Sequence, residues 1–252
     1  MFDARLDPEG LSDADLETLR QFGVRGGLVV PRRGHSLEEA AEATQRVTDV
    51  QVPRLGRAGF DVVTCASAPL WLAGTRGLAR LLDELPEALG RPGVVALGPL
   101  EWSKDGPAER ELLETQLRLA GELGRPVVIT APRLRHEALT ARLLASLDRA
   151  KVEPHRVLID GVSVKTVRSV LARGHLAALS LHPERLGVDL AERLIHSLGP
   201  ERLVLATGAG DGPNDLLALP RLVSRLKQAR LSAGVISRVS GLTLRRFLGR
   251  SD

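Results

Sequence analysis

Short apolar runs rich in β-branched residues recur along the whole chain, and each is followed by a stretch whose apolar positions have helical spacing. This alternation is typical of parallel sheets that are covered by helices. Most of the runs lack polar alternation, as expected for strands buried on both faces. The pattern predicts eight strands, at residues 2–7, 27–32, 61–67, 94–100, 126–131, 156–160, 177–182 and 202–207.

The segments between the strands carry signals for the beginning and end of helices. Residues 12–15 and 36–39 each pair a serine with an acidic residue at capping-box spacing. Residues 108–123 have an apolar stripe at helical spacing with charged residues on the other faces. A final helix is predicted at about 233–249, and other helices are predicted to end at the glycines Gly23, Gly124, Gly174 and Gly199.

Eight strand–helix units in 252 residues match the length of a closed (β/α)8 barrel, the TIM-barrel fold. An open doubly wound sheet usually carries a glycine-rich fingerprint after its first strand, and residues 7–10 contain none. No repeat, linker or low-complexity segment interrupts the chain, so residues 1–252 are predicted to form a single domain. In such a barrel, the functional residues lie at the C-terminal ends of the strands.

Composition narrows the choice of compartment and partner. The chain is 43% hydrophobic and 26% charged, with a net charge of +4, and has neither a long apolar run nor a signal-peptide layout. We therefore expect a cytoplasmic protein with no membrane contact. The single cysteine, Cys65, excludes an internal disulfide and a Cys-x-x-Cys site. With four Phe, two Trp and no Tyr, the chain has few stacking groups, so nucleic acid is not expected as a partner.

Polar residues and glycines gather at the predicted strand ends, which makes them candidates for ligand binding at the barrel mouth. Residues 208–212 form a glycine-rich turn whose amides would suit an anion, although the same pattern matches many plain turns. His182 and His35 are the imidazoles of the rim, and a lone histidine without a paired acid is more typical of a structural role. No catalytic residue is assigned, and the candidate binding residues are Arg5, Asp7, Glu101, Thr130, Asp160, His182, Gly208, Gly210 and Asp211.

Several blocks of sequence follow one another in a recognisable order. Residues 2–7 stand where a D-x-H-x-H strand would be, 95–100 is similar to V-A-I-G-E-I, and 125–130 to L-P-V-x-V-H. Further blocks of the same kind lie at residues 114–120, 157–167, 215–220 and 242–249. In this order the blocks resemble the TatD-like metal-dependent hydrolases, a branch of the amidohydrolase-like barrels. The resemblance implies an amidohydrolase-like TIM barrel whose relatives use two divalent metals.

The positions that the resemblance assigns to metal ligands carry other residues in this chain. Imidazole and carboxylate groups are needed there to hold a divalent ion and activate water. No metal cofactor is therefore predicted. The replacements are Arg5 and Asp7 for two histidines, Pro99 for a glutamate, Thr130 and Gly161 for two further histidines, and Gly210, or Gly208 in another register, for an aspartate.

Arg5 would also repel a cation, because its guanidinium is permanently charged. We hypothesise that Arg5 takes the place of the metal electrostatically and pairs with Asp7, Asp160 or another rim carboxylate. The alternative is an oxygen-rich magnesium or manganese site rebuilt from surviving carboxylates. Those carboxylates are Asp3, Asp7, Glu101, Asp160 and Asp211.

The remaining reactive side chains have structural interpretations. Cys65 lies within a predicted strand, where a free cysteine is usually a small buried hydrophobe. The other histidines fall on predicted outer helices or at the wrong end of the barrel and are predicted to lie at the surface; they are His136, His155, His175 and His196.

Three functions are compatible with these features. The first is a catalytically silent relative of the hydrolases that binds a protein partner or a small ligand, with a homo-oligomer as one form of assembly. The second is a metal-dependent hydrolase of phosphoester or amide bonds with a rearranged site. The third is a binder of phosphate-containing ligands that uses Arg5, Arg32, Arg33 and the glycine turn. The first is favoured, because a fold match without site residues supports only the fold.

Overall fold

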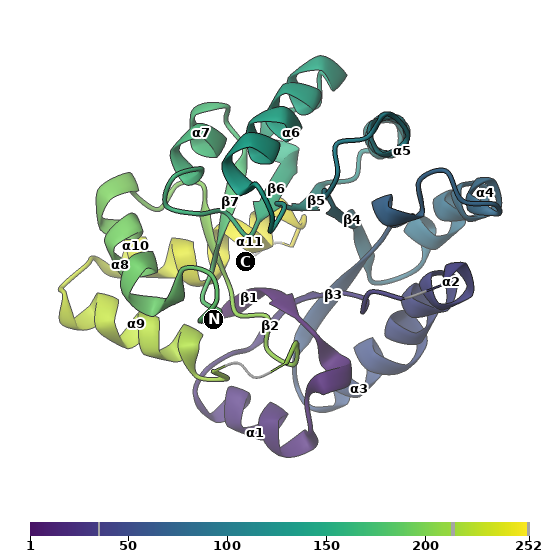
Figure 1. Cartoon of the computed structure of the whole chain (residues 1–252). Helices are drawn as coiled ribbons and strands as arrows, with labels where there is room; N and C mark the ends of the chain where they lie inside the picture. Colours follow the sequence, from purple (N-terminus) through teal and green to yellow (C-terminus); the bar gives the residue numbers. More distant parts are fainter. Residues whose placement is uncertain (35, 213–214, 251–252) are drawn as a thin grey trace.

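Eight parallel strands form one sheet in the order β1 to β8, and helices surround it (Figure 1). The computed structural model describes residues 1–34, 36–212 and 215–250. The predicted TIM-barrel fold is confirmed. The strands are β1 (Phe2–Leu6), β2 (Gly26–Val29), β3 (Asp61–Ala66), β4 (Val94–Glu101), β5 (Val127–Thr130), β6 (Val157–Asp160), β7 (Leu176–Ser180) and β8 (Leu203–Ala206).

All eight strands lie where the apolar runs predict them, and seven of the eight differ at their ends by two residues or fewer. β2 differs most, since it ends at Val29 and not at residue 32. Pro31 has no amide hydrogen and cannot extend the ladder. Val30 still donates its amide to the carbonyl of Leu6, at 3.0 Å, and the chain then turns toward the mouth of the barrel.

The helices follow the strands in alternation, with two α-helices between β2 and β3 and three after β8. They are α1 (Asp13–Gln21), α2 (Leu37–Arg46), α3 (Val52–Arg57), α4 (Leu78–Gly90), α5 (Pro107–Glu122), α6 (His136–Ala150), α7 (Val167–Ala172), α8 (Gly187–Leu198), α9 (Ala218–Gln228), α10 (Ala233–Ser237) and α11 (Thr243–Phe247). Short 3-10 turns lie at η1 (Pro8–Gly10), η3 (Leu70–Leu72) and η4 (Pro154–Arg156), and π-helical turns at η2 (Val47–Gln51) and η5 (Arg238–Leu242).

The predicted helix signals are present. Ser12 and Asp15 form a reciprocal capping box at the start of α1, and the hydroxyl of Ser36 accepts from the amide of Glu39. The four predicted terminal glycines all have positive φ, at +86°, +62°, +87° and +77° in chain order. The prediction of a single helix at 233–249 is wrong, because the backbone of Gly241 is not helical and interrupts the segment. Within the described part of the chain, no helix is long and apolar enough to span a membrane.

Two layers of apolar side chains hold the barrel together. The inner layer takes residues from every strand, such as Ala4, Cys65 and Val128, while the outer layer joins the strands to the helices. Leu244 and Leu248 enter the inner layer from the end of the chain. Burial of this kind, at about 25 cal/mol per Å² of apolar surface, is the main source of stability.

The C-terminal segment forms the floor of the barrel beneath the N-terminal strand. The guanidinium of Arg245 lies 5.4 Å from the centre of the Phe2 ring. Arg245 also pairs with Asp61 at 3.3 Å, and Arg250 pairs with the same carboxylate. These contacts fix the last helix against the opening residues of β1 and β3.

The barrel closes between β8 and β1 through backbone hydrogen bonds at the mouth and through the side chain of Asp3. In the described residues, one backbone bridge, between Leu6 and Ala209, joins these strands. Farther down the strands, Asp3 Oδ1 accepts the amides of Arg5 and Thr207 at 2.9 and 3.0 Å, and Oδ2 accepts the Thr207 hydroxyl at 2.5 Å. The Asp3 carboxylate thus supplies hydrogen bonds where the backbone ladder between β1 and β8 is short.

Two predictions about reactive side chains have different outcomes. Cys65 is fully buried, as expected, and burial raises the pKa of its thiol to about 12. The surface prediction is wrong for His175, which is 2% exposed and bonds through Nδ1 to the carbonyl of Pro154. The start of β7 lies under η4 and is covered by it. His136 is half-buried between the Pro132 carbonyl and the Thr166 hydroxyl, whereas His155 and His196 are exposed.

Asp3 makes the stability of the barrel depend on pH. Burial raises the pKa of Asp3 from 3.8 to about 6, against the opposing effect of its hydrogen bonds. A carboxyl group whose pKa is raised by folding contributes stability below its unfolded pKa and loses it as pH rises through the folded value. Compared with the Asp3→Asn variant, the native chain should lose about 2.4 kcal/mol between pH 4 and pH 7, at about 1.4 kcal/mol per pKa unit.

Urea unfolding of both proteins across this pH range measures the difference. The Asn side chain keeps an acceptor for the two amides, and the Thr207 hydroxyl can rotate to accept from its NH₂ group. If the free energies of unfolding of the two proteins changed with pH in parallel, folding would not raise the pKa of Asp3 and the prediction would be wrong.

Candidate functional site

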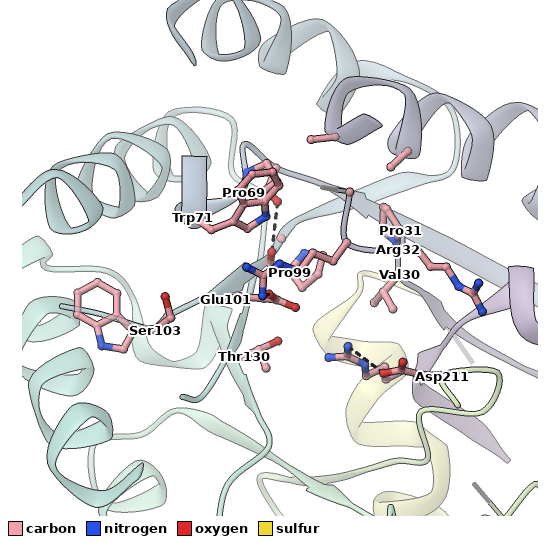
Figure 2. A pocket seen from close by; sticks show the side chains of 18 of the residues that line it. Val30, Pro31, Arg32, Pro69, Trp71, Pro99, Glu101, Ser103, Thr130 and Asp211 are labelled. Atoms are coloured by element: carbon pink, nitrogen blue, oxygen red, sulfur yellow. Dashed lines mark hydrogen bonds and ion pairs between the residues drawn. The ribbon is translucent and has the colours of Figure 1, made fainter. Parts of the chain in front are cut away.

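A cavity of about 610 Å³ opens at the C-terminal ends of the strands (Figure 2). Residues that follow β1 to β5, β7 and β8 line it. Its volume is in the range of small-molecule sites, and its place is where TIM barrels carry their functional residues. In Figure 2, Glu101 and Thr130 of β4 and β5 lie across the cavity from Asp211, which follows β8.

Arg5 and Asp160 form an ion pair at the base of this cavity. Arg5 Nη1 lies 3.1 Å from Asp160 Oδ2, and Nη2 lies 3.6 Å from Asp211 Oδ2. Burial alone lowers the pKa of Arg5, but Asp160 and Asp211 outweigh it and the pKa is raised. Arg5 therefore stays charged. The predicted pairing with a rim carboxylate is present, and the partner is Asp160.

The backbone of β1 explains how Arg5 reaches this position. Ala4 belongs to the inner layer of the barrel, yet its neighbour Arg5 lines the cavity. Strict alternation would send the two side chains to opposite faces. The register with β2 shifts between Asp3 and Leu6, and this irregularity allows both residues to face the barrel axis.

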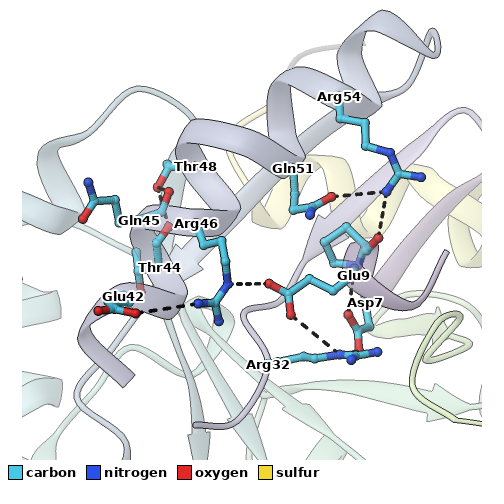
Figure 3. A network of polar contacts seen from close by, with 11 residues as sticks. Asp7, Glu9, Arg32, Glu42, Thr44, Gln45, Arg46, Thr48, Gln51 and Arg54 are labelled. Atoms are coloured by element: carbon cyan, nitrogen blue, oxygen red, sulfur yellow. Dashed lines mark hydrogen bonds and ion pairs between the residues drawn. The ribbon is translucent and has the colours of Figure 1, made fainter. Parts of the chain in front are cut away.

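Asp7 is held by a different arginine, in a network at the edge of the mouth (Figure 3). Arg32 Nε lies 2.6 Å from Asp7 Oδ2 and 3.9 Å from Glu9, and Glu9 is bonded to Arg46 at 2.8 Å. Burial raises the pKa of Asp7, and its bond to Arg32 opposes this. Asp7 and Arg32 thus tie the loop after β1 to the loop after β2.

Glu101 is also paired, at the opposite edge of the cavity. Its carboxylate lies 3.2 Å from Arg33 Nη1, and the same guanidinium lies 5.5 Å from the centre of the Trp71 ring. Each lining carboxylate, Asp7, Glu101 and Asp211, therefore faces an arginine.

Arg133 and Arg185 line the cavity without a direct carboxylate partner. In the described residues Arg133 makes no hydrogen bond or ion pair, and Arg185 Nη1 donates only to the carbonyl of Gly161, at 3.1 Å. Burial lowers the pKa of Arg185; Asp160 opposes this and the nearby Arg133 adds to it. Both guanidinium groups are available to a ligand.

Gly161 makes room for Arg185. A Cβ atom at position 161 would lie 2.4 Å from Arg185 Nη1, and the φ of Gly161 is +74°, a value that favours glycine. The volume next to this backbone is thus filled by a guanidinium from the loop after β7.

The glycine turn after β8 does not present an open set of amides. Gly208 donates its amide to the Arg5 carbonyl at 3.1 Å, and Asp211 donates to Gly208 at 2.8 Å. A Cβ atom at Gly210 would lie 1.9 Å from the carbonyl oxygen of Asp7. Gly208 and Gly210 lie outside the cavity lining and serve the close approach of this loop to β1.

His182 also lies outside the cavity lining. Its Nδ1 accepts the amide of Glu184 at 3.2 Å and so orders the loop after β7. His35, the other imidazole expected at the rim, lies outside the described residues. The structure therefore brings five of the nine predicted binding residues to the cavity wall, namely Arg5, Asp7, Glu101, Thr130 and Asp211, with Asp160 behind Arg5.

A divalent metal does not fit the side chains at the mouth. In the ranges 1–34, 36–212 and 215–250, no three His, Cys, Asp or Glu side chains come together as ligands. Four of the five carboxylates that the rebuilt-site alternative needs are paired with arginines, and the fifth, Asp3, is bonded to Thr207. This donor set suits anions and not cations.

Sequence reasoning missed Arg185 as a member of the site. It comes from the loop after β7, three residues beyond His182. Its guanidinium reaches the cavity by filling the space next to Gly161. The sequence contains one indication of such a residue. Gly161 and Gly210 stand at positions that the resemblance assigns to metal ligands, and a glycine there leaves space that a neighbouring side chain can fill.

Comparisons with known proteins agree with this fold. No protein-family model matches the chain. An uncharacterized metal-dependent hydrolase of Methanocaldococcus jannaschii is 26% identical over 226 residues, which cover 88% of each chain.

Solved structures give the same picture. The TatD-like protein of Archaeoglobus fulgidus superposes with a TM-score of 0.81 at 21% identity, over 99% of this chain and 100% of that one. The phosphotriesterase homology protein of Escherichia coli, solved with phosphate in its active site, has a TM-score of 0.74 at 15% identity, over 98% of each chain. At these identities the structures establish the fold.

The ion pair beneath the cavity should be coupled energetically. Asp160→Asn is expected to lower the free energy of unfolding by about 2 kcal/mol, because it leaves a largely buried guanidinium without its nearest counter-ion. Adding Arg5→Met to this variant should cost less than Arg5→Met costs alone, by about 1 kcal/mol or more. Chemical denaturation of the single and double variants measures the coupling.

The exposed pair of Lys165 and Glu137 supplies the control, at 2.8 Å. Glu137→Gln should leave stability unchanged, because an exposed ion pair contributes little. Additive effects of the Arg5 and Asp160 variants would contradict the coupling.

Proposed function

Because the chain is a relative of the TatD-like metal-dependent hydrolases, we propose that it uses the shared barrel to bind a small ligand at its mouth, without metal-assisted hydrolysis. One observation carries this proposal: the Arg5 guanidinium, held by Asp160, occupies the base of the cavity. A permanently positive group at that place opposes the binding of a metal ion.

The electrostatic penalty is large enough to matter. Two like unit charges 4 Å apart repel by about 4 kcal/mol near a protein surface, and a divalent ion doubles the repulsion. Asp160 and Asp211 are the carboxylates closest to Arg5, and both are engaged by it. A metal would have to displace Arg5 to use either of them.

The cavity wall also offers no activated nucleophile or general base among the described residues. It contains neither histidine nor cysteine, and its three carboxylates are paired with arginines. Cys65 lies in the barrel interior with a pKa of about 12, so its thiolate is not populated at neutral pH. Thr130 has no base within hydrogen-bond reach, since its hydroxyl makes no hydrogen bond to the described residues.

The open cavity supports ligand binding as the function of the barrel mouth. A volume of about 610 Å³ at the mouth, lined by both arginines and apolar side chains, is in the range of small-molecule sites. A barrel kept only for its outer surface would need no such space.

Manganese titration followed by calorimetry tests this proposal. We expect no stoichiometric heat of binding and no shift in Tm on adding Mn²⁺ or on adding a chelator. Hydrolysis of bis(p-nitrophenyl) phosphate should not exceed the rate in buffer, with or without the metal.

Manganese is the sharper probe, because surface imidazoles such as His155 and His196 bind zinc more readily. Two bound manganese ions, together with hydrolysis that the chelator abolishes, would refute the proposal.

A further inference from the structure

Positive charge is in excess in the lining of the cavity. Five arginines and three carboxylates line it, and each carboxylate faces one of three arginines, Arg5, Arg32 or Arg33. Arg133 and Arg185 remain. They are close enough for Arg133 to lower the pKa of Arg185, and burial lowers it further. Two neighbouring guanidinium groups without a counter-ion are unfavourable unless an anion joins them.

Apolar side chains also line the cavity. Trp71 and Pro69 follow β3, Pro99 lies in β4, and Pro132 and Leu134 follow β5. Figure 2 shows Pro69, Trp71 and Pro99 grouped on one wall. Leu134 stands on the rim with 80% of its surface exposed, so folding alone gives it nothing to pack against.

We propose that the ligand is an amphipathic organic anion, whose carboxylate or phosphate binds Arg133 and Arg185 and whose apolar body lies against Trp71, Pro99 and Leu134. This inference rests on the proposed function, since it names the ligand class of the same cavity. Guanidinium groups bind both oxyanions through paired N–H donors.

The arrangement excludes two simpler ligands. Inorganic phosphate would satisfy the arginines but leave the apolar wall in contact with water. A neutral apolar molecule would cover the wall but leave Arg185 desolvated without an anion. Since the described residues provide two arginines without carboxylate partners, the site matches one anionic group and not a polyanion.

Calorimetry and thermal shift with matched small probes test the inference. Phenyl phosphate and 3-phenylpropionate each combine an oxyanion with an aromatic body, and they separate the phosphate and carboxylate cases. At least one of them should bind saturably and raise Tm. Inorganic phosphate should bind at least ten-fold more weakly, and the neutral 3-phenylpropanol should give no shift.

Three variants locate the binding site. Arg185→Met should weaken binding of the anionic probe ten-fold or more, because the desolvated guanidinium makes a charge-assisted bond. Leu134→Ser should weaken it about three-fold by removing apolar contact. Arg118→Met is the matched control: it removes the same charge from an exposed position on α5 and should leave binding unchanged.

The outcomes separate this inference from the proposed function. If neither organic anion binds, or if Arg185→Met and Arg118→Met behave alike, the ligand class is wrong while the manganese result stands on its own. If manganese-dependent hydrolysis is found, the proposed function is wrong, and Arg185-dependent binding of the probe would still support the anion site.

Discussion

The arrangement of the barrel mouth depends on how the charge of Arg5 is neutralised. This guanidinium cannot lose its proton, and β1 places it inside the barrel end, where water is limited. Asp160 therefore stays with it, and Asp211 is drawn from the loop after β8. Once these carboxylates are committed to Arg5, Arg185 has only a backbone carbonyl to bond with. The charge balance at the base of the cavity follows from one residue.

The glycines around the mouth are part of the same arrangement. Gly210 lies so close to the end of β1 that any side chain there would collide with the Asp7 carbonyl, and Gly161 leaves the volume that Arg185 fills. Both positions therefore fit glycine in the present packing. A larger residue at 210 would collide with backbone, and one at 161 would displace the guanidinium of Arg185 and adopt an unfavourable positive φ.

Much of the fold could be predicted from the sequence, because most strands are apolar runs and several helices begin or end at a local signal. The order of β1 to β8 and the burial of Cys65 follow from such patterns. Long-range features could not be predicted in the same way. The sequence suggested Asp7, Asp160 or another rim carboxylate as the partner of Arg5 and could not choose among them, because the choice depends on the register shift in β1. Arg185 was missed because it reaches the site from a loop, and His175 was misplaced because η4 covers it.

The floor of the barrel is built from the last residues of the described chain, with Leu244 and Leu248 in the inner layer and Arg245 over the ring of Phe2. During synthesis, the first strand leaves the ribosome long before these residues exist. The inner faces of the strands therefore stay exposed to water until residues 244–248 have been made. Apolar strands exposed in this way favour aggregation of the nascent chain over that interval.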